Sequence, residues 1–290
     1  MSHSRRAGRR FREPSAGPKE LVRARRATCV TFIALDRAIF ITGAASGIGR
    51  ETARLFARRG WGVGLHDVDE AGLHEVAREI GGGAPARRLN VCDIDEYRAA
   101  VRAFDERFGR MDVLFNCAGV MQMGTFESIP WSDHRRTIDV NVGGVLNGIH
   151  ASLPLLKRTG GARIVTMSSA SAIYGVPELA TYSASKFFVR GLTEALNIEL
   201  ERDGIVVTDL MPLFVNTPLI AAQTRRAGVF ETLGAGLEPR DVAELVFRAA
   251  HGRRRTHWVP GAFLKTLNVL SRALPALSRP LMRYLSRPRR

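Results

Sequence analysis

Short apolar runs alternate with longer amphipathic segments along most of the chain. The apolar runs cover residues 38–42, 61–66, 86–89, 111–115, 162–167, 205–210 and 256–259. Apolar residues recur at helical spacing over residues 47–59, 70–80, 94–108, 132–158, 184–202 and 241–251. Strands that are buried on both faces have continuous apolar sequences, whereas helices on the surface of a sheet are amphipathic. The alternation therefore predicts an α/β fold of βαβ units, in which helices cover both faces of a parallel sheet.

We expect one domain over residues 38–260, because no linker-like stretch interrupts this alternation. The net charge of the 290 residues is +15, but it is concentrated at the two ends. Residues 1–37 contain 10 Lys and Arg against 3 Asp and Glu, and residues 253–290 contain 10 Lys and Arg and no acidic residue. Aromatic residues make up only 7 % of the chain, and no basic stripe interleaved with them crosses the body. Nucleic-acid binding is therefore not expected.

Residues 1–37 lack apolar periodicity and are rich in Arg, Gly, Pro and Ser, so we expect a disordered basic extension. It is either dispensable or an Arg-rich transit peptide. The apolar stretch at residues 29–35 is too short for a signal peptide, and no run of 18 apolar residues predicts a transmembrane helix. A cytoplasmic location is expected. Cys29, Cys92 and Cys117 have no paired spacing, so neither disulfides nor a metal site are expected.

Residues 261–290 show a pattern of their own. Leucines recur there at steps of three and four, at Leu264, Leu267, Leu270, Leu274, Leu277, Leu281 and Leu285. The spacing predicts one apolar helix face, which Pro275 and Pro280 should kink or break. The accompanying basic residues are Arg272, Arg279, Arg283 and Arg287. Such a segment can make peripheral contact with an anionic membrane through residues 263–290, or it can pack on its own domain or on a sister subunit.

A glycine-rich turn joins the first predicted strand to the first predicted helix. It contains Gly43, Ser46, Gly47, Ile48 and Gly49. Glycines let the backbone turn tightly and approach a pyrophosphate, and the N-terminus of the next helix offers free N–H groups. The spacing is G-x-x-x-G-x-G rather than the commoner G-x-G-x-x-G. The strand–turn–helix context nevertheless favours dinucleotide binding over a purely structural turn.

Asp67 ends the second predicted strand, 18 residues after Gly49. A carboxylate there can accept hydrogen bonds from the ribose hydroxyls of NAD, and it would repel the 2′-phosphate of NADP. Ser46 is neutral and offers no positive charge to that phosphate, although Arg50 follows on the helix. An N-cap for the next helix is the alternative role of Asp67. We predict NAD as the cofactor, with NADP less favoured.

Tyr182 and Lys186 stand four residues apart in a predicted helix, which places them on one face. A neighbouring ammonium favours the phenolate and lowers the pKa of a tyrosine from its usual value near 10. The pair can then exchange a proton with an alcohol or ketone. The spacing alone also fits an ordinary exposed helix pair, so its surroundings decide its meaning.

Three further features surround this pair. Ser169 follows an apolar strand by two residues, at the edge of the sheet where α/β proteins bind ligands, and its hydroxyl can polarise a carbonyl. The run Asn116-Cys117-Ala118-Gly119 ends another strand with small residues, which suits a close cofactor contact. Asn141 lies inside the long predicted helix, where asparagine is a poor helix former.

Together these residues resemble the short-chain dehydrogenase/reductase family over residues 38–259. The resemblance implies a Rossmann-like, doubly wound, seven-stranded parallel sheet in three layers, and a catalytic tetrad of Asn141, Ser169, Tyr182 and Lys186. Tyr182 would be the acid/base, and Lys186 would lower its pKa and bind the nicotinamide ribose. Ser169 would hold the substrate oxygen, and Asn141 would anchor a water in a proton relay to Lys186.

The resemblance also implies the residues that bind the cofactor. They are Gly43, Ser46, Gly47, Ile48, Gly49, Asp67, Asn90, Val91, Asn116, Ala118, Gly119, Tyr182, Lys186, Pro212, Val215 and Thr217. Val91 would flank the adenine and Thr217 would meet the carboxamide. The chain departs from the family at Leu213, where glycine is usual, at Asn90, where Asp is common, and at Cys117, which replaces an Asn. We expect a reshaped loop over the nicotinamide and otherwise mild effects.

Residues 214–237 are expected to form the substrate loop. Its residues of interest are Leu219, Ile220, Arg225, Arg226, Val229, Phe230 and Leu233. The other wall is expected to contain Met121, Met123, Tyr174 and Val176. An apolar pocket suits a hydrophobic secondary alcohol or ketone, such as a steroid, a retinoid or a fatty carbonyl compound. For part of these residues, packing within the lid is the alternative.

Two other functions stay open. An NADPH-dependent ketoreductase would share the fold, although Asp67 argues against NADPH. A non-catalytic, NAD-binding regulatory protein would not need the pair Tyr182 and Lys186. The resemblance implies a homodimer or homotetramer, built partly through the helices near residues 132–158 and 181–202.

Overall fold

The computed structural model describes residues 36–234, 236–252 and 256–286. The extension expected at residues 1–37 therefore lies outside the described residues, except for Asp36 and Arg37. Within the described ranges, no helix is both long enough and apolar enough to cross a lipid bilayer.

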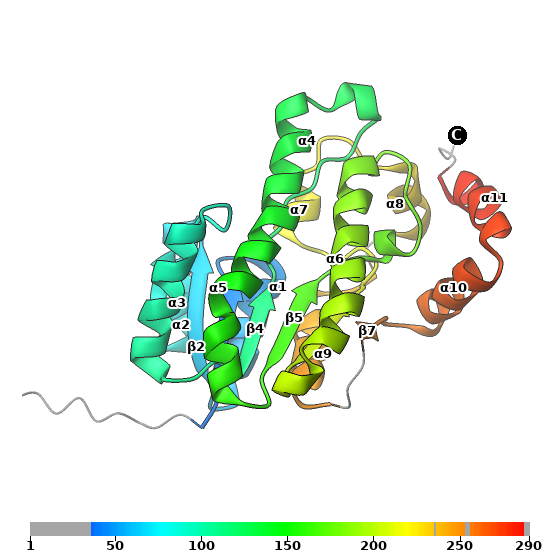
Figure 1. The fold of residues 1–290 in the computed structure, drawn as a ribbon. Helices are drawn as coiled ribbons and strands as arrows, with labels where there is room; N and C mark the ends of the chain where they lie inside the picture. Colours follow the sequence, from blue (N-terminus) through cyan, green and yellow to red (C-terminus); the bar gives the residue numbers. More distant parts are fainter. Residues whose placement is uncertain (1–35, 235, 253–255, 287–290) are drawn as a thin grey trace, which may run out of the picture. The chain divides into compact units, whose positions relative to one another are not determined.

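Seven strands of the described chain form one parallel sheet, in the order β3-β2-β1-β4-β5-β6-β7 (Figure 1). They are β1 (Ala38–Thr42), β2 (Gly62–Asp67), β3 (Ala86–Arg88), β4 (Val113–Asn116), β5 (Arg163–Met167), β6 (Val206–Leu210) and β7 (His257–Trp258). The order reverses at β1, which pairs with both β2 and β4. The predicted doubly wound fold is confirmed, and its ligand crevice is expected at the carboxyl ends of β1 and β4.

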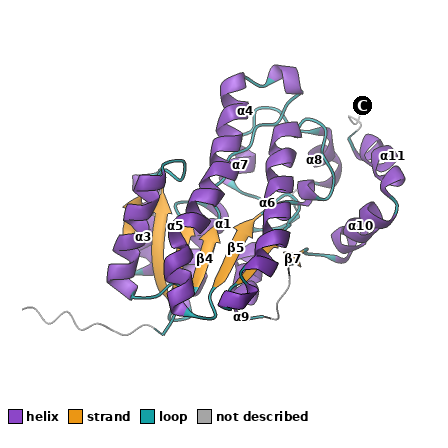
Figure 2. Ribbon diagram, in the orientation of Figure 1, coloured by secondary structure: helices purple, strands orange, loops and turns teal. Residues whose placement is uncertain are grey.

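Helices cover both faces of this sheet (Figure 2). One layer consists of α1 (Gly47–Arg58), α2 (Glu70–Ile80) and α9 (Pro239–His251), and the other of α3 (Ile94–Phe108), α5 (Gly144–Thr159) and α6 (Ala180–Glu199). Side chains alternate along a strand, so Ile39 and Ile41 belong to the first core and Ala38 and Phe40 to the second. Burial on both faces explains why the strands have continuous apolar sequences.

The long helix expected at residues 132–158 contains a π-helical segment. The helix α4 (Trp131–Ile138) begins after Pro130, not after Ser132 as predicted, and it leads through a π-helix at Asp139–Gly143 into α5. Such a segment adds a residue to the helical turn and is frequent at functional sites. Asn141 lies in this π-helix and is completely buried.

The remaining helices belong to the carboxyl-end side of the sheet and to the C-terminal segment. Residues 214–237 contain two short helices, α7 (Pro218–Ala221) and α8 (Gly228–Leu233). The C-terminal segment forms α10 (Ala262–Ala273) and α11 (Pro275–Leu285), and α11 contacts α8. Pro275 begins α11, which confirms the predicted break, whereas Pro280 is accommodated inside α11.

Candidate active site

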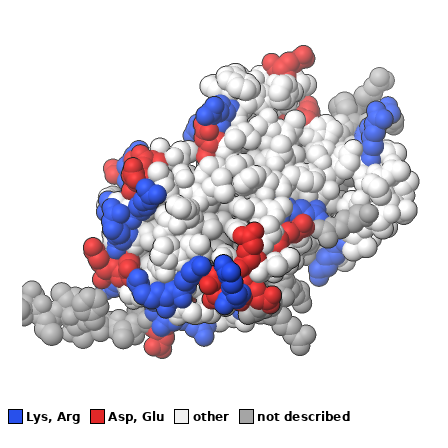
Figure 3. Space-filling view, in the orientation of Figure 1, with Lys and Arg blue, Asp and Glu red and all other residues white. Residues whose placement is uncertain are grey.

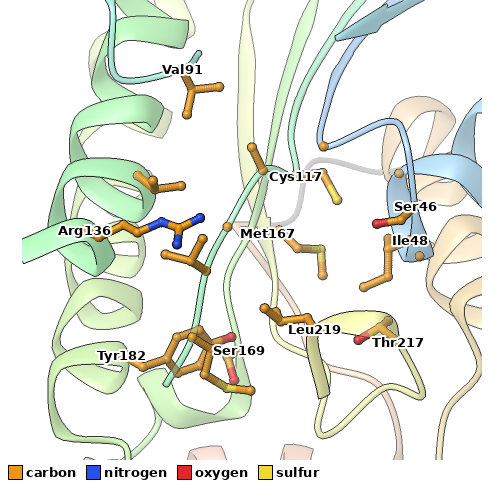
Figure 4. A pocket seen from close by; sticks show the side chains of 18 of the residues that line it. Ser46, Ile48, Val91, Cys117, Arg136, Met167, Ser169, Tyr182, Thr217 and Leu219 are labelled. Carbon is orange, nitrogen blue, oxygen red and sulfur yellow. The ribbon is translucent and has the colours of Figure 1, made fainter. Parts of the chain in front are cut away.

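A large cavity lies at the carboxyl ends of the central strands and has a volume of about 1110 Å³. Figure 4 shows Ser46, Ile48 and Thr217 on one side of it, and Ser169 and Tyr182 on the other. The predicted site residues that line it are Gly43, Ser46, Gly47, Ile48, Gly49, Asp67, Asn90, Val91, Ala118, Gly119, Ser169, Tyr182, Lys186, Pro212, Val215 and Thr217. Among the residues predicted for catalysis and cofactor binding, Asn116 and Asn141 are the two that do not line the cavity.

The glycine-rich turn needs its glycines for conformation and for space. Gly43 has φ of +70°, and a Cβ there would lie 2.9 Å from the backbone nitrogen of Ala118. A Cβ at Gly49 would lie 1.9 Å from the carbonyl oxygen of Gly43. The hydroxyl of Thr42 accepts the backbone N–H groups of Cys117 and Ala118 at 3.1 and 3.2 Å, which joins β1 to the end of β4. The turn is thereby held open toward the cavity at the N-terminus of α1.

Asp67 lines the cavity at the end of β2, and its carboxylate accepts backbone N–H groups from Ala45 at 3.1 Å and Asp69 at 3.2 Å. The N-cap of α2 is Asp69, whose side chain accepts the N–H of Gly72, so the alternative N-cap role does not fall to Asp67. Arg50, the basic side chain considered for a 2′-phosphate, forms ion pairs with Glu79 and Glu75 of α2.

Asn90 and Val91 line the same cavity as Asp67. The side-chain oxygen of Asn90 accepts the N–H of Cys92 at 3.1 Å, and the carbonyl of Val91 accepts the Asn147 amide at 2.9 Å. Asn116 is buried below the cavity, where its amide donates to the Thr166 hydroxyl at 3.4 Å and its oxygen accepts the Tyr97 hydroxyl at 3.4 Å. Because Asn116 does not line the cavity, it can affect a bound cofactor only through neighbouring residues.

Tyr182 and Lys186 lie on one face of α6, with the Lys186 nitrogen 5.4 Å from the centre of the Tyr182 ring. The helix begins at Ala180, four residues earlier than predicted, so Tyr182 lies in its first turn. Burial raises the pKa of Tyr182 to about 12, and a hydrogen bond with the Ser169 side chain opposes that rise. Burial lowers the pKa of Lys186 to about 8. Burial, which disfavours each charged form, is therefore the largest cause of both shifts, and the lowering of the Tyr182 pKa by Lys186 stays a prediction.

Asn141 holds the loop that follows β4. Its amide donates to the Val120 carbonyl and its oxygen accepts the Val120 N–H, both at 2.9 Å, and the amide also reaches the Ser185 hydroxyl at 3.1 Å. A Cβ at Gly119 would lie 3.3 Å from the Asn141 oxygen and 3.9 Å from the Lys186 nitrogen. The Lys186 ammonium donates to the Met167 carbonyl at 2.8 Å. The Asn141 oxygen and the Lys186 nitrogen thus both lie near Gly119.

The segment around Pro212 closes the cavity. The carbonyl of Pro212 accepts the Ala170 N–H at 2.9 Å, which fixes this segment next to Ser169. Thr217 caps α7, and a Cβ at Gly47 would lie 3.4 Å from its methyl group, so α7 begins against the glycine-rich turn. Leu213, where the family usually has glycine, lines the cavity and packs near Ala172 and Met211.

The predicted substrate residues come together in one apolar cluster. Its members from the predicted set are Met121, Met123, Tyr174, Val176, Leu219, Ile220, Val229, Phe230 and Leu233. Met121, Leu219 and Ile220 line the cavity, whereas Val176, Val229 and Phe230 are buried behind it. Arg226 stacks over the Phe230 ring at 5.0 Å. Some of the predicted substrate residues therefore pack inside the substrate loop and do not line the cavity, as the sequence had left open.

Sequence reasoning missed three contributors to this region. Arg136 of α4 points into the cavity in Figure 4, one helical turn and a half before Asn141. The Gln223 side chain bridges the Met121 carbonyl at 3.1 Å and the Met123 N–H at 3.0 Å, which pins the end of α7. Met282 and Leu285 of α11 complete the apolar cluster. The periodic leucines contained a signal for Leu285, but nothing local indicated which surface it covers.

Comparison with known proteins places this geometry in context. A family model described as short chain dehydrogenase matches residues 37–227. The cyclohexanol dehydrogenase of Acinetobacter sp. (strain SE19) is 33 % identical over 216 residues, a match that covers 73 % of this chain and 86 % of that protein. The 3-alpha-(or 20-beta)-hydroxysteroid dehydrogenase of Mycobacterium tuberculosis is 34 % identical over 214 residues, covering 73 % of this chain and 81 % of that protein.

Solved structures show the same likeness. A short chain dehydrogenase/reductase from Burkholderia phymatum in complex with NAD has a TM-score of 0.75 at 28 % identity, covering 83 % of this chain and 94 % of that one. A 3-ketoacyl-(acyl-carrier-protein) reductase from Brucella melitensis complexed with NADH has a TM-score of 0.70 at 31 % identity, covering 77 % of this chain and 96 % of that one.

Proposed function

This chain belongs to the short-chain dehydrogenase family of oxidoreductases, and we propose that it transfers a hydride between NAD(H) and a hydrophobic secondary alcohol or its ketone. The observation that carries the proposal is that Tyr182, Ser169 and Lys186 line the same cavity as Asp67, with the Lys186 nitrogen 5.4 Å from the centre of the Tyr182 ring. The first three side chains suit proton transfer at a substrate oxygen, and the carboxylate suits a ribose.

The residues present fit a dinucleotide. The tight turn at Gly43 and Gly49 leaves no room for side chains, and its N–H groups and the N-terminus of α1 suit a pyrophosphate. Asp67 is free of the N-cap role, and Arg50 is engaged by Glu75 and Glu79, which together support NAD over NADP. When bound, the nicotinamide supplies the two-electron hydride donor or acceptor.

In the direction of reduction, the Tyr182 hydroxyl gives its proton to the ketone oxygen while the carbonyl carbon receives the hydride. In the direction of oxidation, the phenolate accepts the alcohol proton as the carbon–oxygen double bond forms. Ser169, which shares a hydrogen bond with Tyr182, would hold the same oxygen. Lys186 would stabilise the phenolate electrostatically, and Asn141 would position Lys186 through the Gly119 loop.

The substrate side of the cavity supports an apolar substrate. Met121, Leu219 and Ile220 line it, and no basic group of the lid reaches it, since Arg226 is stacked on Phe230 and Arg225 is not part of the lining. The cyclohexanol and hydroxysteroid dehydrogenases among the relatives act, by their names, on compounds of this kind. A cyclic or steroid-like secondary alcohol is therefore the first class to assay.

We also propose a homodimer or homotetramer built through α5 and α6. Leu146 of α5 and Phe187 of α6 are apolar yet 44 % and 42 % exposed, and the surface over these helices is largely free of charged side chains (Figure 3). An exposed apolar face of this kind is typical of a subunit interface. Light scattering of wild-type protein and of Leu146→Glu/Phe187→Glu tests it: the double variant should be monomeric.

Turnover tests the proposed function directly. We expect wild-type protein to reduce NAD in the presence of cyclohexanol or a hydroxysteroid, and Tyr182→Phe to lower kcat by about 10²- to 10⁴-fold while it still binds NADH. Tyr284→Phe, which removes the hydroxyl of an exposed tyrosine outside the cavity, is the matched control. Turnover that persists in Tyr182→Phe would contradict the acid/base role. NADH binding without turnover of any such alcohol would instead favour the regulatory alternative.

A further inference from the structure

The C-terminal helices α10 and α11 each have an inner side packed on the domain. On α10, Leu264 is 5 % exposed in an apolar cluster with Ile173 and Met211, and Asn268 accepts a hydrogen bond from Arg190 of α6 at 3.3 Å. On α11, Met282 and Leu285 are buried in the apolar cluster on the substrate side. The inner sides of both helices therefore pack on their own domain, which was one of the three possibilities that the sequence left open.

The outer sides are apolar as well. On α11, Leu277, Leu281 and Tyr284 follow one another at helical spacing and are 60 %, 39 % and 69 % exposed. On α10, Phe263, Val269 and Leu270 are 54 %, 64 % and 48 % exposed, and Leu274 between the helices is 50 % exposed. Inner packing therefore does not explain the leucine-rich pattern, because four of its seven leucines are exposed. We call these seven residues the outer face.

Within α10 and α11 the charged residues all have the same sign. Lys265, Arg279 and Arg283 are exposed on α10 and α11, and residues 253–290 contain no Asp or Glu. In Figure 3 the part of the surface formed by these two helices shows blue and white atoms on the right of the molecule. At 100° per residue of α11, Arg279 and Arg283 lie on one side of the outward direction and the exposed apolar side chains on the other, so the cations border the apolar stripe on one side.

We propose that the outer face of α10 and α11 docks on an anionic membrane surface. Exposed Leu, Phe and Tyr side chains suit the boundary between headgroups and acyl chains, and flanking Lys and Arg suit anionic headgroups. A second copy of the chain fits less well, because a symmetric contact would bring the same cations together. Docking would hold α11, which packs on the apolar cluster of the substrate loop, against the phase in which apolar alcohols dissolve; this consequence rests on the proposed function.

Sedimentation with vesicles tests the docking without any turnover, so its result is independent of the proposed function. Full-length wild-type protein should sediment with phosphatidylcholine vesicles that contain phosphatidylglycerol, and at least about tenfold more weakly with phosphatidylcholine alone or in high salt. Arg279→Gln/Arg283→Gln should weaken binding by about thirtyfold, and Leu277→Gln/Leu281→Gln by at least about tenfold.

Matched controls carry the same changes elsewhere. Arg102→Gln/Arg202→Gln removes two exposed charges outside the outer face, and Ile198→Gln changes a side chain of α6 that is 75 % exposed. Both should bind vesicles like the wild type, and all variants should keep its melting temperature. If the outer-face variants sediment like the wild type, the proposal is overturned, and any vesicle binding must come from other basic segments of the chain. Variants that change the oligomeric state in light scattering would overturn it in favour of a subunit contact.

Discussion

A Cβ atom at Gly228 would lie 2.5 Å from the backbone carbonyl oxygen of Ser286. Gly228 begins α8 and Ser286 ends α11, so two backbones that are far apart in sequence touch at this point. On the other side of Gly228, its N–H donates to the Glu178 carboxylate at 2.8 Å. Gly228 of the substrate loop is therefore held between Glu178 and the end of the C-terminal helix, and a side chain there must move one of them.

Gly228→Ala should loosen the substrate side and leave the cofactor end intact. Overpacking of this kind costs about 1–3 kcal/mol, and here the displaced element is α11, with Met282 and Leu285. We expect the KM for a hydrophobic alcohol to rise several-fold while the Kd for NADH stays unchanged. Gly236→Ala is the control, because a Cβ at Gly236 meets nothing within 4 Å. Unchanged KM and melting temperature in Gly228→Ala would show that this contact is dispensable.

Asp67→Ala should change the cofactor preference. Removing a charged acceptor of two ribose hydroxyls would weaken NADH binding by about 10- to 100-fold, and removing the negative charge would let NADPH bind better. Fluorescence titration with both cofactors measures the ratio. Asp69→Ala is the matched control, because it removes an aspartate two residues away that caps α2 and lies outside the cavity. It should lower stability by about 1 kcal/mol with the cofactor ratio unchanged. A wild-type preference for NADPH would contradict the role of Asp67.

The pH dependence of turnover should depend on Lys186. Burial favours the protonated Tyr182, with a pKa of about 12, so oxidation, which needs the phenolate, should become faster as the pH rises. Lys186, with a pKa lowered to about 8, is still mostly charged at pH 7 and opposes this effect of burial. Lys186→Met should lower kcat/KM for oxidation by about 10²- to 10⁴-fold at pH 7 and move its rise to higher pH.

Lys186→Arg separates charge from shape, because the guanidinium stays charged at every pH used. It should recover part of the activity and keep the rise at lower pH than Lys186→Met. Profiles of kcat/KM against pH for the three proteins give the answer. Coinciding profiles for Lys186→Met and the wild type would mean that Lys186 does not act on the Tyr182 proton.

His66 should make the protein less stable in mild acid. Its ring is 3 % exposed and stacks on Phe40 with centroids 3.7 Å apart, and burial lowers its pKa to about 3. The unfolded chain binds a proton below about pH 6.5, whereas the folded chain does not until about pH 3. Because the unfolded state binds more protons in this window, the free energy of unfolding falls as the pH falls through it.

Urea unfolding at pH 7 and pH 5 measures this effect. Relative to His66→Gln, the wild type should lose about 2 kcal/mol between the two pH values. His150→Gln removes an exposed histidine and serves as the control, whose loss should match that of the wild type. Equal losses in His66→Gln and the wild type would show that His66 does not titrate differently in the two states.

Local patterns predicted the strands and most helices closely. The helices expected at residues 70–80 and 94–108 were found at those bounds, because each has an aspartate cap before it and a glycine after it. The start of α6 was missed by four residues. Leu179, Ala180 and Thr181 show no capping signal, and the helix start is fixed instead by contacts such as that between Thr181 and His134 at 2.7 Å.

The identity of the candidate site residues was predictable from the sequence, but the burial and direction of their side chains were not. The spacing of Tyr182 and Lys186 predicted their common face, and the structure has it. The extent of burial around Tyr182, which raises its pKa, was not predictable, because it depends on contacts with residues that are distant in sequence. The role of Arg136 in the cavity wall was also missed, because its side-chain direction follows from how α4 packs.

The sequence by itself determined the order of strands and helices, the glycine-rich turn and the spacing of the polar residues, since each depends on neighbours along the chain. The tertiary structure alone decided which side chains are buried, that Asn141 faces Val120 rather than the cavity, and that α11 covers the substrate side. These features depend on contacts between distant segments, as between Gly228 and Ser286, and no local pattern specifies which distant partner a side chain meets.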